Sequence, residues 1–192
     1  ADMLPVFLRS IDDMEESFDA CQYVCDHTEC FMKFLYKLGR GVKGRMLLDK
    51  GNFVRSSCAR QAARLAEMWE AGCELRVLRP AGGCYPCMHA RTLIFDKRVV
   101  LTGSVNMTHN GFENNKEHLF RIDTPSTVLD VYEDFLETWG ASQKVDQTMI
   151  DEMMVASEKA KDKRRQKNVV RSLSAEIDRE GRVPRQEGGR RS

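Results

Sequence analysis

The stretch His89–Asn106 reads HARTLIFDKRVVLTGSVN, and it decides the fold. Apolar and β-branched residues fill Met88–Phe95 and Val99–Thr102, which predicts two antiparallel strands joined near Asp96-Lys97. Because side chains alternate between the two faces of a strand, His89 and Arg91 are expected to point the same way. The sequence therefore predicts a β-hairpin with an imidazole and a guanidinium side by side at one end.

The residues around this hairpin predict a sheet flanked by helices. Strands are expected over 18–25, 42–48, 73–77 and 117–122. Helices are expected from a capping box at Asp26 and Glu29 to Gly39, from a cap at Ser56 or Ser57 to Gly72, and from Thr124-Pro125 to Gly140. The order is βαβαβ, then ββ, β and α. It indicates an α/β fold, with a mixed β-sheet between helices.

Polar side chains at the ends of these strands indicate phosphate chemistry. Ser104 and Asn106 share one face, and each can hydrogen-bond a phosphate oxygen. Glu117, on the next expected strand, is placed to orient the imidazole of His89. A nucleophile, an orienting acid and an anion clamp form the usual constellation of nucleophilic catalysis. Arg91 and the neighbouring donors can hold a phosphoryl group without a metal or another cofactor.

The spacing of these residues resembles the signature of the phospholipase D superfamily, which is called the HKD motif. The family pattern is H-x-K, four residues, D, six residues, G-S-x-N, and then N-x-E. The chain matches it at His89, Asp96, Gly103, Ser104, Asn106, Asn115 and Glu117, and it has Arg91 where the family has Lys. The resemblance covers roughly residues 4–140. It is greatest to the single-motif members, the mitochondrial cardiolipin hydrolase/Zucchini type and the bacterial Nuc-type endonucleases.

The resemblance implies a phospholipase D-like fold with half an active site in each chain. His89 would attack phosphorus and form a phosphohistidine, while a second His from another motif protonates the leaving oxygen. Asp96 is a structural residue in the family, and Gly103 belongs to the same conserved pattern. The histidines at 27, 109 and 118 lack the H-x-K/R spacing. A homodimer with both His89 side chains in one cleft is therefore expected, acting on a phospholipid or a single-stranded nucleic acid.

Two features leave other hypotheses open. Arginine keeps the charge of lysine but not its shape, so Arg91 also fits a catalytically impaired module that binds anionic partners. Cys84 and Cys87 have C-x-x-C spacing just before His89, which allows a zinc-stabilised protein, a redox pair or a loop with two thiols. The thiol loop is the simplest interpretation, because no second ligand pair is evident.

Composition bounds the rest of the 192 residues. We expect a phospholipase D-like domain over 1–140, a charged helical extension over 141–171 and a disordered tail over 172–192. Residues 141–192 hold 13 basic and 9 acidic side chains, so this part of the chain could contact nucleic acid or anionic lipid. Seven cysteines without a disulfide framework favour a reducing, intracellular setting. The cytoplasm fits this, as does a mitochondrial surface if an N-terminal anchor precedes the chain.

Overall fold

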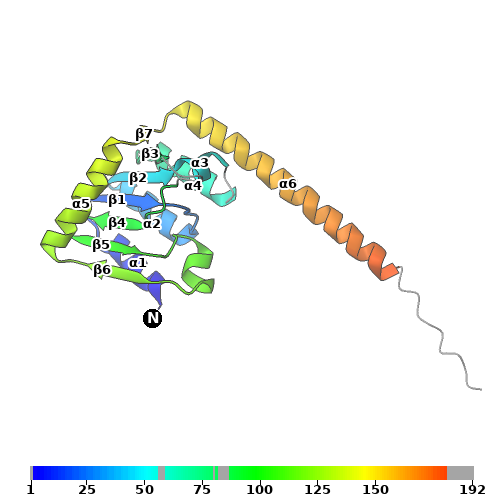
Figure 1. Cartoon of the computed structure of the whole chain (residues 1–192), viewed down its shortest axis with the longest axis horizontal. Coiled ribbons are helices and arrows are strands. Elements are labelled where there is room, and N and C mark those ends of the chain that lie inside the picture. The colour runs from blue at the N-terminus through cyan, green and yellow to red at the C-terminus, as the bar shows by residue number, and fades with distance from the viewer. Residues whose placement is uncertain (1, 56–58, 80, 82–86, 181–192) are drawn as a thin grey trace, which may run out of the picture.

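A computed structural model describes residues 2–55, 59–79, 81 and 87–180 (Figure 1). The helices are α1 (Met3–Asp13), α2 (Thr28–Gly39), α3 (Lys50–Arg55), α4 (Ala59–Glu70), α5 (Pro125–Gly140) and α6 (Gln147–Glu180), with a π-helical turn η1 (Asn110–Asn114). The strands are β1 (Ser17–Gln22), β2 (Lys43–Asp49), β3 (Glu74–Leu78), β4 (Thr92–Phe95), β5 (Val99–Gly103), β6 (Leu119–Ile122) and β7 (Gln143–Lys144).

These strands form one mixed seven-stranded sheet in the order β6-β5-β4-β1-β2-β3-β7. The βαβ units make β1, β2 and β3 parallel neighbours, whereas β4 runs antiparallel to β1 and starts the β4-β5-β6 meander. The carboxyl ends of β1 and β2 therefore lie at the same end of the sheet as the beginning of β4 and the end of β5. This arrangement confirms the expected mixed sheet flanked by helices.

Alternating side chains give the sheet two apolar faces. Phe18 and Ala20 of β1 face a core formed with α1, α2, α4 and the start of α6, while Cys21 faces a smaller core under α5. The larger core holds fully buried aromatic residues such as Phe31 and Phe34. Burying both faces is what fixes the register, because a shift by one residue would exchange the two sets.

The turn between β4 and β5 confirms the expected hairpin. Asp96 and Lys97 have φ angles of 51° and 55°, in the left-handed region, and the N–H of Arg98 donates to the carbonyl of Phe95 over 2.9 Å. Two successive positive φ angles match the right-handed twist of the flanking strands, and Asp tolerates this conformation better than most residues.

Several expected boundaries were wrong. Strand β4 begins at Thr92, so His89 and Arg91 lie in an extended lead-in, because pairing with β1 starts only at Cys21 opposite Thr92. Strand β6 begins at Leu119 instead of 117. The sequence interpretation missed α1, α3 and β7, and the expected caps Ser56 and Ser57 lie outside the described residues.

The carboxyl-terminal segment is more helical than expected. Helix α6 continues to Glu180, nine residues past the expected end of the charged extension at 171, and the rest of the expected tail, 181–192, lies outside the described residues. This helix projects away from the body (Figure 1). Among the helices that the model describes, none is both long and apolar enough to cross a membrane.

Candidate active site

A buried carboxylate fixes the segment that carries His89. Asp49, the last residue of β2, accepts hydrogen bonds from the N–H of Met88 over 3.0 Å and the N–H of Asn52 over 2.8 Å. The Asp49 side chain is 4% exposed, and Met88 packs beneath α5. These contacts hold the backbone one residue before His89, so the imidazole emerges at the carboxyl ends of β1 and β2.

The imidazole of His89 is exposed and lies against the guanidinium of Arg91. Arg91 Nη2 is 2.9 Å from His89 Nε2, and Arg91 Nη1 is 3.2 Å from Nδ1. The guanidinium also donates to the carbonyl of His89 over 3.1 Å and, through Nε, to Oδ1 of Asn106 over 2.7 Å. The expectation that His89 and Arg91 point the same way is confirmed by these contacts.

The two nitrogen contacts of His89 cannot both be hydrogen bonds. A neutral imidazole has one acceptor nitrogen, and every guanidinium nitrogen is a donor. Arg91 therefore covers the nitrogen lone pair that would attack an electrophile. An arriving phosphate would offer the guanidinium stronger, charged acceptors, so substrate can draw Arg91 away from the ring.

Tyr23 completes the surroundings of His89. Its ring meets the imidazole edge to face, with centroids 4.6 Å apart, and the Arg91 guanidinium lies 5.8 Å from the Tyr23 ring centre. Tyr23 follows β1, and its carbonyl accepts from the side chain of Asn52 over 3.3 Å. The Tyr23 ring thus restricts the rotation of the His89 and Arg91 side chains.

The carboxylate of Glu117 holds the neighbouring polar groups. The hydroxyl of Ser104 donates to Glu117 Oε2, and Nδ2 of Asn115 donates to Oε1 over 3.1 Å. The Ser104 oxygen also accepts the N–H of His118 over 3.0 Å. Within the described residues, the hydrogen bonds of Glu117 go to Ser104 and Asn115, whereas the ring of His89 lies against Arg91. The expected orienting contact between Glu117 and His89 is therefore not formed in the single chain.

Gly103 permits the close approach that brings these groups together. A Cβ at this position would lie 2.0 Å from the carbonyl oxygen of His118. The N–H of Ser104 donates to the same oxygen over 3.0 Å, so β5 and the segment before β6 pack backbone to backbone. A glycine is needed because there is no room for a side chain.

Asp96 lies at the opposite end of the hairpin from His89. Its carboxylate accepts the backbone N–H groups of Glu15, Glu16 and Ser17 over 2.8, 2.7 and 2.8 Å. The hairpin turn is thereby tied to the linker between α1 and β1. The contacts agree with the structural role that the resemblance implied for this residue.

The remaining histidines lie away from His89. His27 stands at the amino-terminal cap position of α2 without a capping hydrogen bond from its side chain, and it is 8% exposed. Its ring packs edge to face on Phe112, and its Nδ1 has no hydrogen-bond partner among the described residues. Burial lowers the pKa of His27 below 6.5, against the opposing charges of Glu29 and Glu113. His109 pairs with Glu113 over 3.0 Å. None of these contacts brings a second imidazole to His89.

The cysteines divide between core and surface. Burial raises the pKa of Cys21 to about 12 and that of Cys30 and Cys73 well above the usual value, so these thiols are unreactive core groups. Cys87 is exposed, and Cys84 lies outside the described residues. Over the part of the chain that the model describes, no three His, Cys, Asp or Glu side chains gather as metal ligands.

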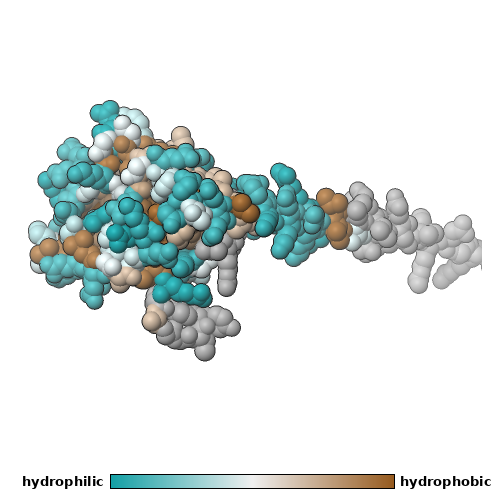
Figure 2. Space-filling view, turned by 90° about the horizontal axis from the view of Figure 1, so that it is seen from above, coloured by the Kyte–Doolittle hydropathy of each residue, from teal (hydrophilic) through white to brown (hydrophobic). Residues whose placement is uncertain are grey.

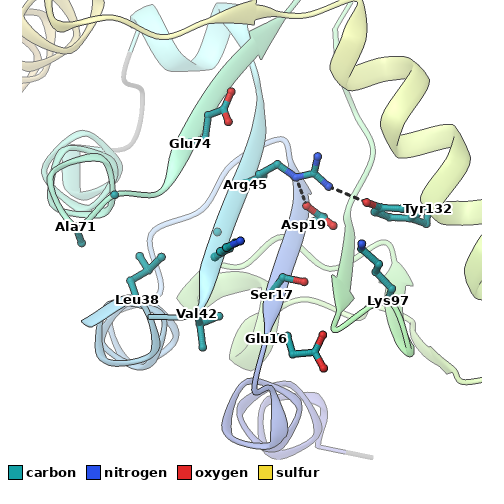
Figure 3. Close-up of a pocket in the computed structure, with 13 residues that line it drawn as sticks. Glu16, Ser17, Asp19, Leu38, Val42, Arg45, Ala71, Glu74, Lys97 and Tyr132 are labelled. Atoms are coloured by element: carbon teal, nitrogen blue, oxygen red, sulfur yellow. Dashed lines mark hydrogen bonds and ion pairs between the residues drawn. The ribbon is translucent and has the colours of Figure 1, made fainter. Parts of the chain in front are cut away.

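A cavity of about 680 Å³ lies at the other end of the sheet (Figure 3). Its wall includes the first residues of β1 and β2, the loop after α4, and Tyr132 of α5. Arg45 donates to Asp19 over 2.5 Å and to the Tyr132 hydroxyl over 3.3 Å, and its guanidinium is 5.0 Å from the ring centre of Phe135. Asp19, Arg45 and Tyr132 thus bond to one another, and the cavity is separated from His89 by the length of the strands.

Sequence reasoning identified the polar groups but missed their supports. Arg91 and Asn106 meet directly beside His89, and Ser104, Asn115 and Glu117 form an adjacent cluster. Tyr23 and Asp49 were missed as site residues. Asp49 directly follows the strand predicted over 42–48, and a polar residue at the carboxyl end of a parallel strand was the available signal. Tyr23 fell inside the strand predicted over 18–25, which ends at Gln22 in the structure.

Comparisons with known proteins agree with this geometry. A family model described as "Cardiolipin synthase, PLD-like domain" matches residues 7–139. The chain is 28% identical over 131 residues to a phospholipase D of Rickettsia conorii, covering 68% of this chain and 59% of that protein. It is 26% identical over 132 residues to the mitochondrial cardiolipin hydrolase of Homo sapiens, covering 69% of this chain and 49% of that protein. The chain thus spans about half to three-fifths of these relatives.

Solved structures show the same fold at low identity. NucT from Helicobacter pylori superposes with a TM-score of 0.68 at 21% identity, covering 75% of this chain and 91% of that chain. The phospholipase D family member Nuc from Salmonella typhimurium gives a TM-score of 0.65 at 21% identity, with the same two coverages. The sheet and its flanking helices are therefore those of this group of structures.

Proposed function

Since this chain belongs to the family of cardiolipin synthase PLD-like domains, we propose that it is a metal-independent phosphodiesterase that works as a homodimer. The observation that carries the proposal is the exposed imidazole of His89, with the guanidinium of Arg91 2.9 Å away and bonded to Asn106. A nucleophile (His89), a cation (Arg91) and an amide (Asn106) lie together at the open end of the β4-β5 hairpin, as phosphoryl transfer requires.

The proposed reaction has two steps. In the first, His89 forms a P–N bond as the P–O bond to the leaving group breaks, and the His89 of a second copy gives the leaving oxygen its proton. In the second, that same imidazole accepts a proton from water, whose oxygen bonds to phosphorus while the P–N bond breaks. Arg91 and Asn106 hold the phosphoryl oxygens, and Glu117 positions the side chains of Ser104 and Asn115.

The need for a second copy follows from the placement of the other histidines. His27 is buried against Phe112, and His109 is paired with Glu113. The His118 side chain is exposed beyond Ser104, and the described contacts do not bring it to His89. A two-fold dimer that apposes two His89 side chains supplies the acid that one chain lacks. Sedimentation of the purified protein at micromolar concentration tests this, and a strict monomer with full activity would contradict it.

A second function is favoured by one contact. Arg91 lies over both ring nitrogens of His89, at 2.9 and 3.2 Å, so the nucleophile is covered in the absence of substrate. If phosphate does not displace the guanidinium, the same residues form a binding site without turnover. Lysine would present one compact ammonium in place of the planar fork and would leave the ring more accessible.

One assay separates the two functions. Hydrolysis of bis(p-nitrophenyl) phosphate is measured with EDTA present for the wild type, His89→Ala and Arg91→Lys, with His109→Ala as the matched surface control. For an active enzyme we expect the wild type to turn over and His89→Ala to lose at least about 10³-fold, since removing a catalytic nucleophile typically costs this much or more.

Three other outcomes are informative. A wild type without activity, together with an active Arg91→Lys, identifies the covered, impaired site. Activity that survives His89→Ala contradicts the mechanism, and activity lost in EDTA contradicts metal independence. Hydrolysis of cardiolipin vesicles, single-stranded DNA and RNA by the same proteins, also with EDTA present, distinguishes the substrate classes, which share this chemistry.

A further inference from the structure

Helix α6 is divided between an anchored start and a projecting remainder. Ile150, Met153 and Ser157 are buried at 5%, 1% and 1% exposure, where the helix packs on the body. After Ser157 the described side chains are exposed or half-buried as far as Arg171. Figure 1 shows the helix extending away from the sheet, and Figure 2 shows a largely hydrophilic surface along it.

Four basic residues form a single row on the projecting part. Lys159, Lys163, Lys167 and Arg171 follow one another at intervals of four residues, and all four are exposed. Residues four apart are neighbours on a helix surface, with a rise of about 6 Å per step, so the row extends over about 18 Å. We call these four residues the basic ladder.

The basic ladder carries uncompensated charge. Lys161, on another side of the helix, pairs with Glu158 over 2.5 Å. Among the described residues, the members of the ladder have no such ion pair or hydrogen bond. Like charges four residues apart destabilise a helix, and this part of α6 has no packing to offset the repulsion. An anionic partner with repeated charges would remove that cost.

The composition of α6 favours a polyphosphate chain over a membrane surface. The apolar residues between Lys159 and Arg171 are Ala160, Val169 and Val170. The two exposed valines are adjacent in sequence instead of three or four residues apart, so the segment lacks the broad apolar face that an interfacial helix inserts into lipid. Asp162 is three residues from Lys159 and therefore lies beside the ladder, where it would face an anionic bilayer unfavourably. A nucleic-acid strand needs only a line of cations along its phosphates.

The position of α6 connects the basic ladder with the candidate site. The helix packs on α3 and α4, and α3 starts directly after Asp49. Asp49 holds the N–H of Met88 over 3.0 Å, next to His89. In Figure 1, α6 leaves the body at the end of the sheet where α3 lies. This is also the end where Asp49 closes β2 and holds the residue before His89.

We propose that the basic ladder of α6 binds the phosphate backbone of a nucleic-acid strand and leads it to the site at His89. The delivery to His89 rests on the proposed phosphodiesterase function, whereas the binding does not. The ladder would then select polymeric substrates over small phosphodiesters, which reach His89 without it.

Two double variants with the same charge change test the proposal. Lys163→Gln/Lys167→Gln removes two members of the ladder, and Lys161→Gln/Arg165→Gln removes two cations from another side of the helix. Binding of a 30-nucleotide single-stranded oligonucleotide is measured as a function of salt in the His89→Ala background, where cleavage cannot interfere. Circular dichroism confirms equal helix content.

We expect the ladder variant to bind at least tenfold more weakly and to lose about 1.4 from the slope of log K against log salt, since each phosphate contact contributes about 0.7. The Lys161→Gln/Arg165→Gln variant should keep most of the affinity and most of the salt dependence. Equal losses in the two variants would overturn the proposal, and so would unchanged oligonucleotide binding or a ladder-dependent affinity for phosphatidylglycerol vesicles only.

A separate measurement keeps this test independent of the proposed function. Hydrolysis of bis(p-nitrophenyl) phosphate by chains with an intact His89 should be equal in the two double variants. If the wild type is inactive but still binds the oligonucleotide through the ladder, the proposed phosphodiesterase function is wrong and the proposed nucleic-acid binding stands. If that activity is present but oligonucleotide cleavage is not lowered in the ladder variant, the delivery role is wrong.

Discussion

The two ends of the β4-β5 hairpin use polar side chains in opposite ways. At the turn, one carboxylate, that of Asp96, accepts three backbone N–H groups at 2.7 to 2.8 Å and joins the hairpin to the linker before β1. At the open end, His89, Arg91 and Asn106 bond mainly to one another and remain accessible. The same motif thus contributes a structural half at the turn and a chemical half at the open end.

The difference explains why such different residues recur in one motif. The turn needs a charged acceptor that tolerates a positive φ, which Asp96 provides at 51°. The open end needs groups whose bonds can be exchanged for bonds to a phosphate. Side-chain contacts at exposed positions are exchanged at low cost, whereas bonds to the backbone cannot be lost without loosening the fold.

The largest effect on stability is expected at the turn. Asp96→Ala removes all three acceptor contacts and leaves alanine at a positive φ, so we expect the free energy of unfolding to fall by about 3 kcal/mol in urea titrations. Asp96→Asn is the matched variant, since it tolerates the backbone conformation and keeps one carbonyl acceptor. It should lose about half as much.

Both Asp96 variants should keep the activity of the open end. Turnover per folded molecule, with the folded fraction taken from the urea curves, is expected to stay within about twofold of the wild type. A large loss of turnover in fully folded Asp96→Asn would show that the two ends are coupled, and the division between a structural and a chemical half would then be wrong.

The next effect should appear in activity alone. Ser104→Ala removes an exposed hydroxyl that joins Glu117 to the N–H of His118, so stability should change by less than about 1 kcal/mol. Turnover should fall roughly 10- to 100-fold, because a phosphate donor is lost and Glu117 is released. Ser142→Ala, which removes a hydroxyl bonded to the carbonyl of Trp139, is the remote control and should leave turnover unchanged.

The sequence predicted the parts of the molecule that local patterns encode. Alternation placed the hairpin, and motif spacing selected His89, Ser104 and Asn106 as site residues. The supports escaped because they depend on the topology: Tyr23 and Asp49 precede His89 by 66 and 40 residues, and only the parallel pairing of β1 and β2 brings them to one edge. The pairing of Glu117 with Ser104 was missed for the same reason. The alternation of side chains along a strand shows which face a residue occupies, but it does not identify a partner on the far side of a loop.

The length of α6 also could not be predicted from pattern. The apolar residues of its first turns indicate a packed helix, but beyond Ser157 the sequence is charged and offers no periodic apolar face. Charged sequences of this kind are compatible with a helix or with a solvated tail. The helical conformation to Glu180 therefore extends beyond what hydrophobic spacing alone can indicate.

The smallest effect concerns the packing that supports the open end, and it depends on pH. The N–H groups of Asp26 and His27 donate to the carbonyl of Met107 over 2.9 and 3.1 Å, so His27 lies beneath the loop that carries Asn106. Burial lowers the pKa of the imidazole, hence the unfolded chain binds a proton more readily than the folded one. The contribution of His27 to stability is then complete above a pH of about 6.5 and declines as the pH falls toward the folded-state pKa.

This sign gives a measurable difference between two variants. From pH 7.5 to 5.5 the wild type should lose up to about 1.4 kcal/mol more free energy of unfolding than His27→Gln, the limit for one group over one pH unit below 6.5. His109→Gln, which removes an exposed imidazole paired with Glu113, is the matched control and should keep most of the wild-type pH dependence. An unchanged pH dependence in His27→Gln would assign the acid sensitivity to other groups and would separate the open end from the packing around His27.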